Sequence, residues 1–124
     1  MNLRKEERIR ILVVEPGKAP ETAQIPNTLE AMQQIVGGLI QPVTLDDNIC
    51  LVCNEEGKLL GMEGNRRLGN DIIVGTFFVA AVDGEEFSSL NEECLSKYSE
   101  LFAQPQSFTQ EEIRAANRMA FYFW

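Results

Sequence analysis

The sequence predicts an α+β fold, with a mixed, mostly antiparallel sheet of four to six strands, one early helix and two C-terminal helices. Two observations carry this prediction. Between residues 9 and 82, short apolar runs alternate with polar turns that contain glycine or proline, a pattern typical of strands. Over residues 86–124, apolar side chains recur at helical spacing instead. A chain of 124 residues, 44% of them hydrophobic, can bury one core, so we expect residues 1–124 to form a single domain.

The chain is expected to begin with two strands and a helix. Residues 9–14 form a β-branched run, and residues 19–25 fit an edge strand because prolines interrupt and end it. Asn27 is expected to cap a helix, since Glu30 follows three residues later as in a capping box. The glycine pair that starts at Gly37 is expected to end this helix.

Strands are expected again from residue 39 onward. Residues 39–45 and 48–53 are strand-like. The turn after them predicts a hairpin into residues 58–62, with Gly57 at the positive φ that such a turn requires. Residues 63–71 are rich in glycine and asparagine and are expected to be irregular.

Residues 72–82 carry the strongest strand pattern in the chain. The run is apolar apart from one glycine-threonine step, which predicts a central strand with a bulge or a close approach at Gly75. Helices are expected after it. The first should start near Ser88 or Ser89, and the second at a capping box that opens with Thr109.

The composition argues against the commonest catalytic and metal sites. The chain has no histidine, which removes every Ser-His-Asp or Cys-His arrangement. Cys50 and Cys53 have the spacing of a redox dithiol or half a zinc site, but residues three apart in a strand point to opposite faces, and Cys94 is the only further cysteine. We therefore expect structural cysteines, no metal and no cofactor, and the balance favours a protein without catalytic activity.

Charge and hydropathy limit the partners. The formal net charge is −8, and an acidic surface disfavours direct nucleic-acid binding, which depends on clustered Lys and Arg. No apolar run approaches the roughly 18 residues of a membrane span, and the charged first residues do not resemble a signal peptide. We expect a cytoplasmic protein that contacts no membrane.

Three polar turns, over residues 15–18, 54–58 and 65–67, hold the candidate binding residues, because function concentrates in loops. The candidates are Glu15, Lys18, Asn54, Glu55, Glu56, Lys58, Asn65 and Arg66. None of the turns has the spacing of a phosphate-binding loop. The guanidinium groups could hold an external anion, but we favour the interpretation that an arginine here pairs with a nearby carboxylate and pins a loop.

Residues 119–124, MAFYFW, are apolar on nearly every side of a helical turn. One face can dock on the domain, whereas a second aromatic face would mark an association site. The candidate interface residues are Phe121, Tyr122, Phe123 and Trp124, which we call the aromatic segment. Full burial under the chain's own sheet is an equally good interpretation.

Several of these motifs together resemble a known family. They are ILVVEPGKAPE from residue 11, LEAMQQIVGG from residue 29, CNEEGK from residue 53, Asn65-Arg66, and GTFF from residue 75. In this order they resemble the uncharacterised bacterial and phage family called domain of unknown function 3846. The resemblance implies a family-like α+β core over about residues 9–85, and leaves 86–124 as a helical pair. It also implies an origin on phage, plasmid or conjugative DNA of Gram-positive bacteria, with no established activity.

We expect a non-enzymatic binding or accessory protein of a mobile genetic element that acts through protein–protein contacts, with a partner protein or a second copy of itself. Two alternatives stay open. One is a small-molecule or nucleotide-ligand enzyme whose site gathers the three turns, with Lys18 or Arg66 holding an anion and Glu55 or Glu15 acting as base. The other is an acidic mimic of nucleic acid, which requires carboxylates spaced along one face.

Overall fold

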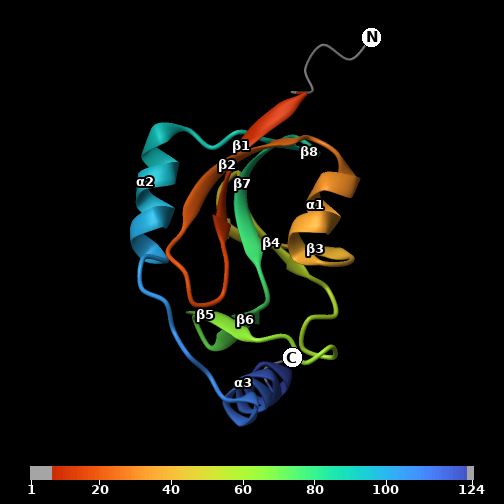
Figure 1. Cartoon of the computed structure of the whole chain (residues 1–124), viewed down its shortest axis with the longest axis vertical. Helices are drawn as coiled ribbons and strands as arrows, with labels where there is room; N and C mark the ends of the chain where they lie inside the picture. Colours follow the sequence, from red (N-terminus) through yellow and green to blue (C-terminus); the bar gives the residue numbers. More distant parts are fainter. Residues whose placement is uncertain (1–6, 123–124) are drawn as a thin grey trace.

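The computed structural model describes residues 7–122, with side chains through residue 116. The helices and strands, in chain order, are β1 (Arg8–Val14), β2 (Glu21–Pro26), α1 (Leu29–Val36), β3 (Ile40–Asp46), β4 (Ile49–Asn54), β5 (Gly64–Leu68), β6 (Asp71–Val74), β7 (Phe77–Asp83), β8 (Glu86–Ser88), α2 (Glu92–Leu101) and α3 (Gln110–Tyr122). Figure 1 shows the helices flanking the sheets.

A six-stranded antiparallel sheet forms the centre of the molecule. Its order is β2-β1-β7-β4-β3, and β8 pairs with the second half of β7. β5 and β6 form a separate antiparallel hairpin. The predicted α+β class, with one early and two late helices, is confirmed. β7 is central and buried over most of its length, as its apolar pattern predicted.

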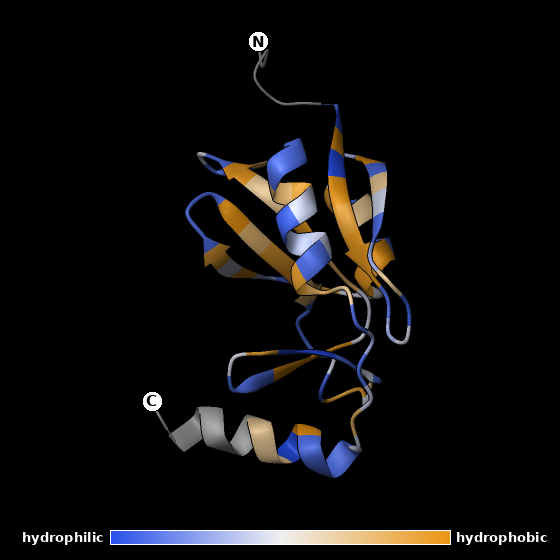
Figure 2. Ribbon diagram, turned by 90° about the vertical axis from the view of Figure 1, so that its left-hand side faces the viewer, coloured by the Kyte–Doolittle hydropathy of each residue, from blue (hydrophilic) through white to orange (hydrophobic). Residues whose placement is uncertain are grey.

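The helices α1 and α2 cover opposite faces of this sheet (Figure 1). Alternation along β4 shows why both faces are apolar: Cys50 and Val52 pack toward α1, whereas Leu51 and Cys53 pack toward α2. The two cysteines therefore lie on opposite faces, as their spacing predicted. α1 itself is amphipathic. Figure 2 looks onto α2, in front of the sheet, and shows hydrophilic residues along much of the outer side of that helix.

The early helix is capped by Thr28, not by Asn27. Thr28 Oγ1 accepts a hydrogen bond from the N–H of Ala31 at 3.1 Å. Asn27 Nδ2 instead donates to the carbonyl of Phe87 at 3.0 Å, so its side chain ties the start of α1 to β8. Gly37 ends the helix in the left-handed conformation, as predicted.

The segment over residues 55–74 departs most from the prediction. Residues 58–62 form turns instead of a strand, and β4 pairs with β3 and β7. Residues 63–71, expected to be irregular, instead contribute β5 and the start of β6. Gly57 does not have a positive φ. A Cβ there would lie 2.8 Å from Val74 Cγ2, so this glycine lets the turn approach β6 closely.

The apolar run over residues 72–82 is two strands instead of one. β6 ends at Val74 and β7 begins at Phe77, because the chain bends at Gly75, whose φ is 72°. A Cβ on Gly75 would lie 2.7 Å from Met62 Sδ, so the close approach predicted at this glycine is confirmed. Hydrophobicity alone cannot reveal the bend, because both strands are buried.

The second helix starts later than predicted. Ser88 ends β8, and Ser89 Oγ accepts a hydrogen bond from the N–H of Arg10 at 2.9 Å. Asn91 is the N-cap of α2, and its side chain accepts from the N–H of Cys94 at 2.8 Å. The two serines therefore belong to the sheet and its connection.

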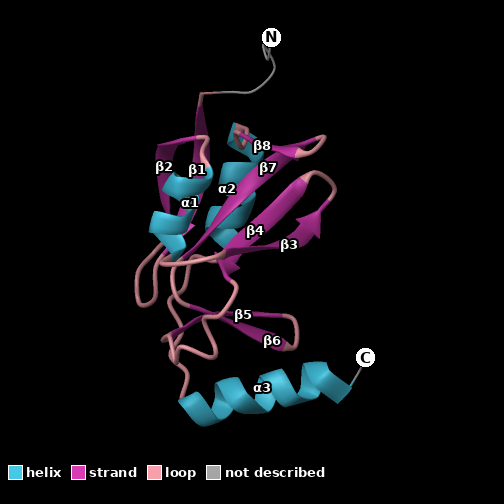
Figure 3. Ribbon diagram, turned by 90° about the vertical axis from the view of Figure 1, so that its right-hand side faces the viewer, coloured by secondary structure: helices cyan, strands magenta, loops and turns pink. Residues whose placement is uncertain are grey.

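The third helix begins at the predicted capping box. The N–H of Thr109 donates to Glu112 Oε1 at 2.8 Å, and the N–H of Glu112 donates to Thr109 Oγ1 at 3.0 Å. α3 lies mainly against β6, where Ile113 is buried with Ile72 and Val74. The β5–β6 hairpin and α3 thus form a small layer at one end of the main sheet (Figure 3).

The β3 edge of the main sheet lacks a central hydrogen-bond donor. The N–H of Glu55 donates to the carbonyl of Leu39 at 2.8 Å. Hydrogen-bonded and non-hydrogen-bonded residue pairs alternate in an antiparallel ladder. The backbone N–H and C=O groups of Gln41 and Val43 therefore point toward β4, and the backbone of Pro42 points outward. Proline has no N–H to offer a further strand.

The β2 edge is blocked in a different way. The peptide groups of Arg10 bond to Ser89 and Leu90, so Gln24, its partner on β2, turns its own peptide groups outward. Arg8 Nη2 donates to this outward carbonyl of Gln24 at 3.1 Å. A side chain therefore already occupies the acceptor that another strand would use.

Candidate functional site

Asn65 and Arg66 lie on β5, and both have an exposed fraction of 0%. Asn65 Nδ2 donates to the carbonyl of Val14 at 2.9 Å and to that of Gly75 at 2.8 Å. This one amide group joins the hairpin to the end of β1 and to the bend before β7.

Arg66 extends the link to two further segments. Its Nε donates to the carbonyl of Phe102 at the end of α2, at 3.0 Å, and its Nη2 donates to the carbonyl of Lys18. Its Nη1 donates to the backbone oxygen of Asn65 at 3.2 Å and to Asn65 Oδ1 at 2.7 Å. We call Asn65 and Arg66 with these acceptors the Arg66 hub.

The Arg66 hub contains no carboxylate, which corrects the interpretation that this arginine pins a loop by an ion pair. Among the described residues, its hydrogen-bond acceptors are three backbone carbonyls and one side-chain amide oxygen. Burial lowers the pKa of Arg66, because desolvation disfavours the charged form, yet a guanidinium stays protonated in proteins. Every guanidinium nitrogen already has an acceptor, so the hub is structural and not an anion site.

The 15–18 turn meets the hub through its main chain only. Its charged side chains face solvent, where Lys18 Nζ lies 3.9 Å from Glu15 Oε1. An exposed pair at this distance contributes little to stability. These two candidates are therefore surface charges beside the hub.

Asn54 is buried with its own main-chain partners. Its Nδ2 donates to the carbonyl of Val36 at the end of α1, at 3.1 Å, and its Oδ1 accepts from the N–H of Glu56 at 2.7 Å. The side chain thus fixes the turn against α1 as an Asx turn. Glu56 lines an open depression beside α1, together with Gln33.

A cleft with a volume of about 710 Å³ opens between the turn over residues 54–59, the edge strand β3, β6 and the start of α3. We call it the α3 cleft. Its main apolar lining residues are Val43, Cys53, Leu59, Ile73, Val74 and Ile113, and its main polar ones are Gln41, Glu55, Lys58, Asp71, Gln110 and Arg114. Ligand sites in proteins have this size and this mixture of an apolar surface with a few polar groups.

One ion pair lies in the wall of the α3 cleft. Lys58 Nζ contacts Asp71 Oδ1, and both side chains are partly exposed. The same oxygen accepts a hydrogen bond from the N–H of Ile72 at 2.8 Å. Burial raises the pKa of the Cys53 thiol, and the carboxylate of Asp71 raises it further. The thiol is therefore protonated at neutral pH, which argues against a nucleophile.

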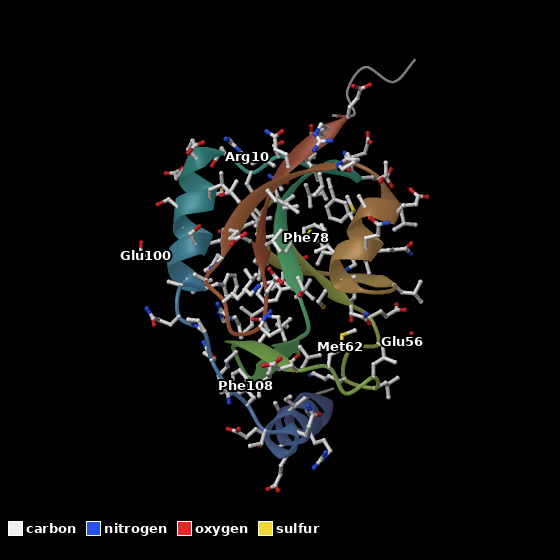
Figure 4. All side chains as sticks on the ribbon, viewed as in Figure 1. Arg10, Glu56, Met62, Phe78, Glu100 and Phe108 are labelled. Carbon is white, nitrogen blue, oxygen red and sulfur yellow. The ribbon has the colours of Figure 1, made fainter. Side chains whose placement is uncertain are left out.

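The mouth of the α3 cleft exposes a large apolar side chain. Leu59 has an exposed fraction of 87%, and its neighbour Leu60 one of 61%. Figure 4 shows Met62, at the other end of this turn, lying toward the hairpin. Met62 is partly buried against Ile72 and Val74, whereas the middle of the turn is exposed to solvent.

The candidates from the sequence separate into distinct places. Asn54, Glu55 and Lys58 line the α3 cleft. Asn65 and Arg66 form the hub, and the remaining candidates lie at the surface elsewhere. The three turns therefore do not share one cavity.

Four polar lining residues of the α3 cleft are not among the candidates from the sequence: Gln41, Asp71, Gln110 and Arg114. Gln110 and Arg114 follow from the capping box, which places them on the first turns of α3. The partner of that helix was not predictable, because β6 was assigned to a longer strand in the main sheet. Asp71 carries no sequence signal apart from its place before an apolar run.

Carboxylates gather at the opposite end of the main sheet. The group consists of Asp46, Asp47, Asp83, Glu85, Glu86, Glu92 and Glu93, on the β3–β4 and β7–β8 turns and the first turn of α2. Lys97 Nζ lies 3.2 Å from Asp46 Oδ2, and Arg10 Nη1 lies 2.9 Å from Glu92 Oε1. The hydrogen bond from the N–H of Asp47 lowers the pKa of Asp46, and the bond from Lys97 lowers it further.

The predicted interface lies outside the described side chains. The backbone of α3 is described through Tyr122, and the side chains of the aromatic segment are not. Over the described residues, no three side chains of the His, Cys, Asp or Glu types come together as a metal site. None of the helices within residues 7–122 has the length and hydrophobicity that a membrane crossing requires.

Comparison with known proteins identifies a family without an assigned activity. Residues 9–103 match the family described as Domain of unknown function (DUF3846), and the chain therefore belongs to it. The match runs beyond residue 85 and includes α2, whereas α3 lies outside it. No curated protein and no solved structure matches the chain.

Proposed function

We propose that this DUF3846 protein is a non-enzymatic accessory protein of a mobile genetic element, and that it binds other polypeptides in the α3 cleft. The observation that carries the proposal is the cleft itself, with a volume of about 710 Å³, an apolar interior and Leu59 exposed at its mouth. Concave apolar surfaces with an exposed anchor are typical of protein recognition sites.

The use of the other polar candidates supports binding over catalysis. Asn54, Asn65 and Arg66 are consumed by hydrogen bonds to the main chain, and Cys53 carries a protonated thiol. Lys58 is already neutralised by Asp71. The cleft therefore offers shape and apolar surface around a protonated thiol and a neutralised lysine.

Both alternative functions are less well supported. The enzyme alternative requires one concave site that gathers the three turns. Of these turns, only the one over residues 54–58 contributes residues to the α3 cleft. Nucleic-acid mimicry requires a row of carboxylates along one face. The acidic groups instead gather around one end of the sheet, and two of them are paired with Lys97 and Arg10.

A site-specific photo-cross-linker tests the proposal. A benzophenone amino acid is placed at position 59 in the full chain, produced in a host that carries the mobile element. The matched control is position 101, because Leu101 is also exposed, at 58%, but lies on α2 away from the cleft.

We expect protease-sensitive, nuclease-resistant adducts from position 59 and not from position 101. Adducts that a nuclease removes, or equal adducts from both positions, would contradict the proposal. Substitution of Val43 by Asp in the photo-reactive chain should abolish the adduct, since this side chain lines the cleft.

A further inference from the structure

We propose that the partner in the α3 cleft is a second copy of this chain, which inserts its aromatic segment Phe121–Trp124. This inference rests on the proposed function, in which the cleft receives a polypeptide. It names the occupant and predicts a closed dimer in which each copy both gives a segment and receives one.

The chemistry of the segment suits an apolar cleft. It holds four consecutive aromatic residues, and Met119 and Ala120 precede it. Aromatic side chains are the commonest anchors of protein interfaces, because they bury a large area at a low cost in conformational entropy. The cleft offers a complementary apolar lining that includes Val43, Val74 and Ile113.

The segment cannot enter the cleft of its own chain. The cleft is lined by the start of α3, through Gln110, Ile113 and Arg114. The helix continues without a break to Tyr122, eight residues beyond Arg114. At 1.5 Å per residue this is about 12 Å further along the axis. The segment would have to unwind α3 to fold back, whereas another copy can approach from outside.

Figure 3 shows the same geometry. The backbone of α3 runs on beyond the turn of the β5–β6 hairpin. The helix thus carries its far end away from the hairpin it packs on. The aromatic sequence of the segment and the apolar lining of the cleft are complementary in chemistry.

The two edges of the β2-β1-β7-β4-β3 sheet disfavour the alternative mode of self-association, which is strand addition. The β3 edge lacks the donor that Pro42 cannot supply, and on the β2 edge Arg8 occupies the carbonyl of Gln24. These edges therefore favour contact between copies through side chains. One segment and one cleft per chain close a twofold dimer and leave neither unpaired.

The charges predict how salt acts on the dimer. In the cleft, Lys58 pairs with Asp71, and the cation of Arg114 is matched by the anion of Glu55, so the lining carries no net charge. The whole chain carries −8, so two copies repel at long range. Added salt screens this repulsion and leaves apolar contact intact. We expect the dissociation constant to fall as salt rises.

Trp124 is the only tryptophan, so its fluorescence reports on the segment directly. The full chain is studied over a wide dilution series by light scattering for mass and by Trp emission for burial. We expect the mass of two chains at high concentration, with a blue-shifted emission that shifts to red as the dimer dissociates on dilution.

The variant Leu59→Glu places a charge at the mouth of the cleft. It should weaken the dimer by roughly tenfold or more, because Leu59 can then no longer make an apolar contact with the inserted segment. Leu101→Glu is the matched control on an exposed leucine and should leave the dissociation constant unchanged. Circular dichroism confirms that both variants fold.

Three outcomes would overturn the inference. They are a monomer at every concentration, a blue-shifted Trp emission that does not depend on concentration, and a dimer that Leu59→Glu leaves intact. Failure here is distinct from failure of the proposed function. A monomer that still gives protein adducts from position 59 retains the proposed function and loses only the second copy as its partner.

Discussion

Replacement of Arg66 by Met tests whether the Arg66 hub holds the small layer to the main sheet. The substitution puts an apolar side chain of similar length in place of the guanidinium and removes the donors to the carbonyls of Phe102, Lys18 and Asn65 and to Asn65 Oδ1. Four acceptors on three segments then lose their partner inside the protein. At about 1 kcal/mol for each lost bond, the free energy of unfolding should fall by about 4 kcal/mol.

The loss is large on the scale of a domain, whose total stability is about 5–15 kcal/mol. Urea unfolding followed by circular dichroism measures it. With an m-value of about 2 kcal/mol per molar urea, the midpoint should fall by about 2 M. Arg66→Lys keeps the charge but cannot reach acceptors on opposite sides at once, so it should also lose more than about 2 kcal/mol.

The neighbouring arginine provides the control. Arg67 is exposed, and its guanidinium lies 5.6 Å from the centre of the Phe108 ring. Arg67→Met should therefore cost only about 0.5 to 1 kcal/mol. Equal losses for the two methionine variants would refute the assignment of the hub as the link between the layers.

Three further predictions concern single features. Gly75→Ala should lower the urea midpoint more than Gly84→Ala. Both glycines have a positive φ, but only at Gly75 would the added Cβ lie against the sulfur of Met62. Equal losses would show that this contact does not matter for stability. Iodoacetamide at pH 7 should label Cys94 alone in the folded protein, since burial raises the pKa of both β4 thiols, one of them to about 11; mass spectrometry that finds a labelled β4 thiol would contradict their burial. Thr109→Ala should cost about 1 kcal/mol and speed hydrogen exchange in the first turn of α3; unchanged exchange there would mean that the capping box does not hold the helix start.

The sequence was most informative where one local signal decides the structure. The capping box at Thr109 and the left-handed residue Gly37 each act through their own backbone, so their position could be predicted closely. The separation of Cys50 and Cys53 onto two faces follows from strand periodicity alone. The strand order does not, because it depends on contacts between distant segments.

The errors have a common physical cause in the segment from Gly57 to Phe77. Glycine was interpreted there through backbone conformation, whereas Gly57 is needed because β6 lies against it. The apolar pattern of β6 and β7 is continuous, and only the bend at Gly75 sends the first of them into another sheet. Such choices are made by tertiary packing, which a single sequence does not display.

The candidate site divides in the same way. Asn65 and Arg66 were chosen as polar residues in a turn, and their residue types favoured surface binding. In the structure they are fully buried and satisfy carbonyls of segments far apart in sequence. The α3 cleft needs the placement of α3 on β6, and so it could not be predicted before that contact was known.

Pro42 has a consequence for how the protein behaves at high concentration. An exposed strand with a full set of donors and acceptors is the usual starting point for fibril growth, in which each added molecule recruits the next through its backbone. The missing N–H at Pro42 and the side chain of Arg8 on the outward carbonyl of Gln24 each remove one backbone group that such recruitment would use. We therefore expect these two edges of the main sheet to be poor templates for fibril growth.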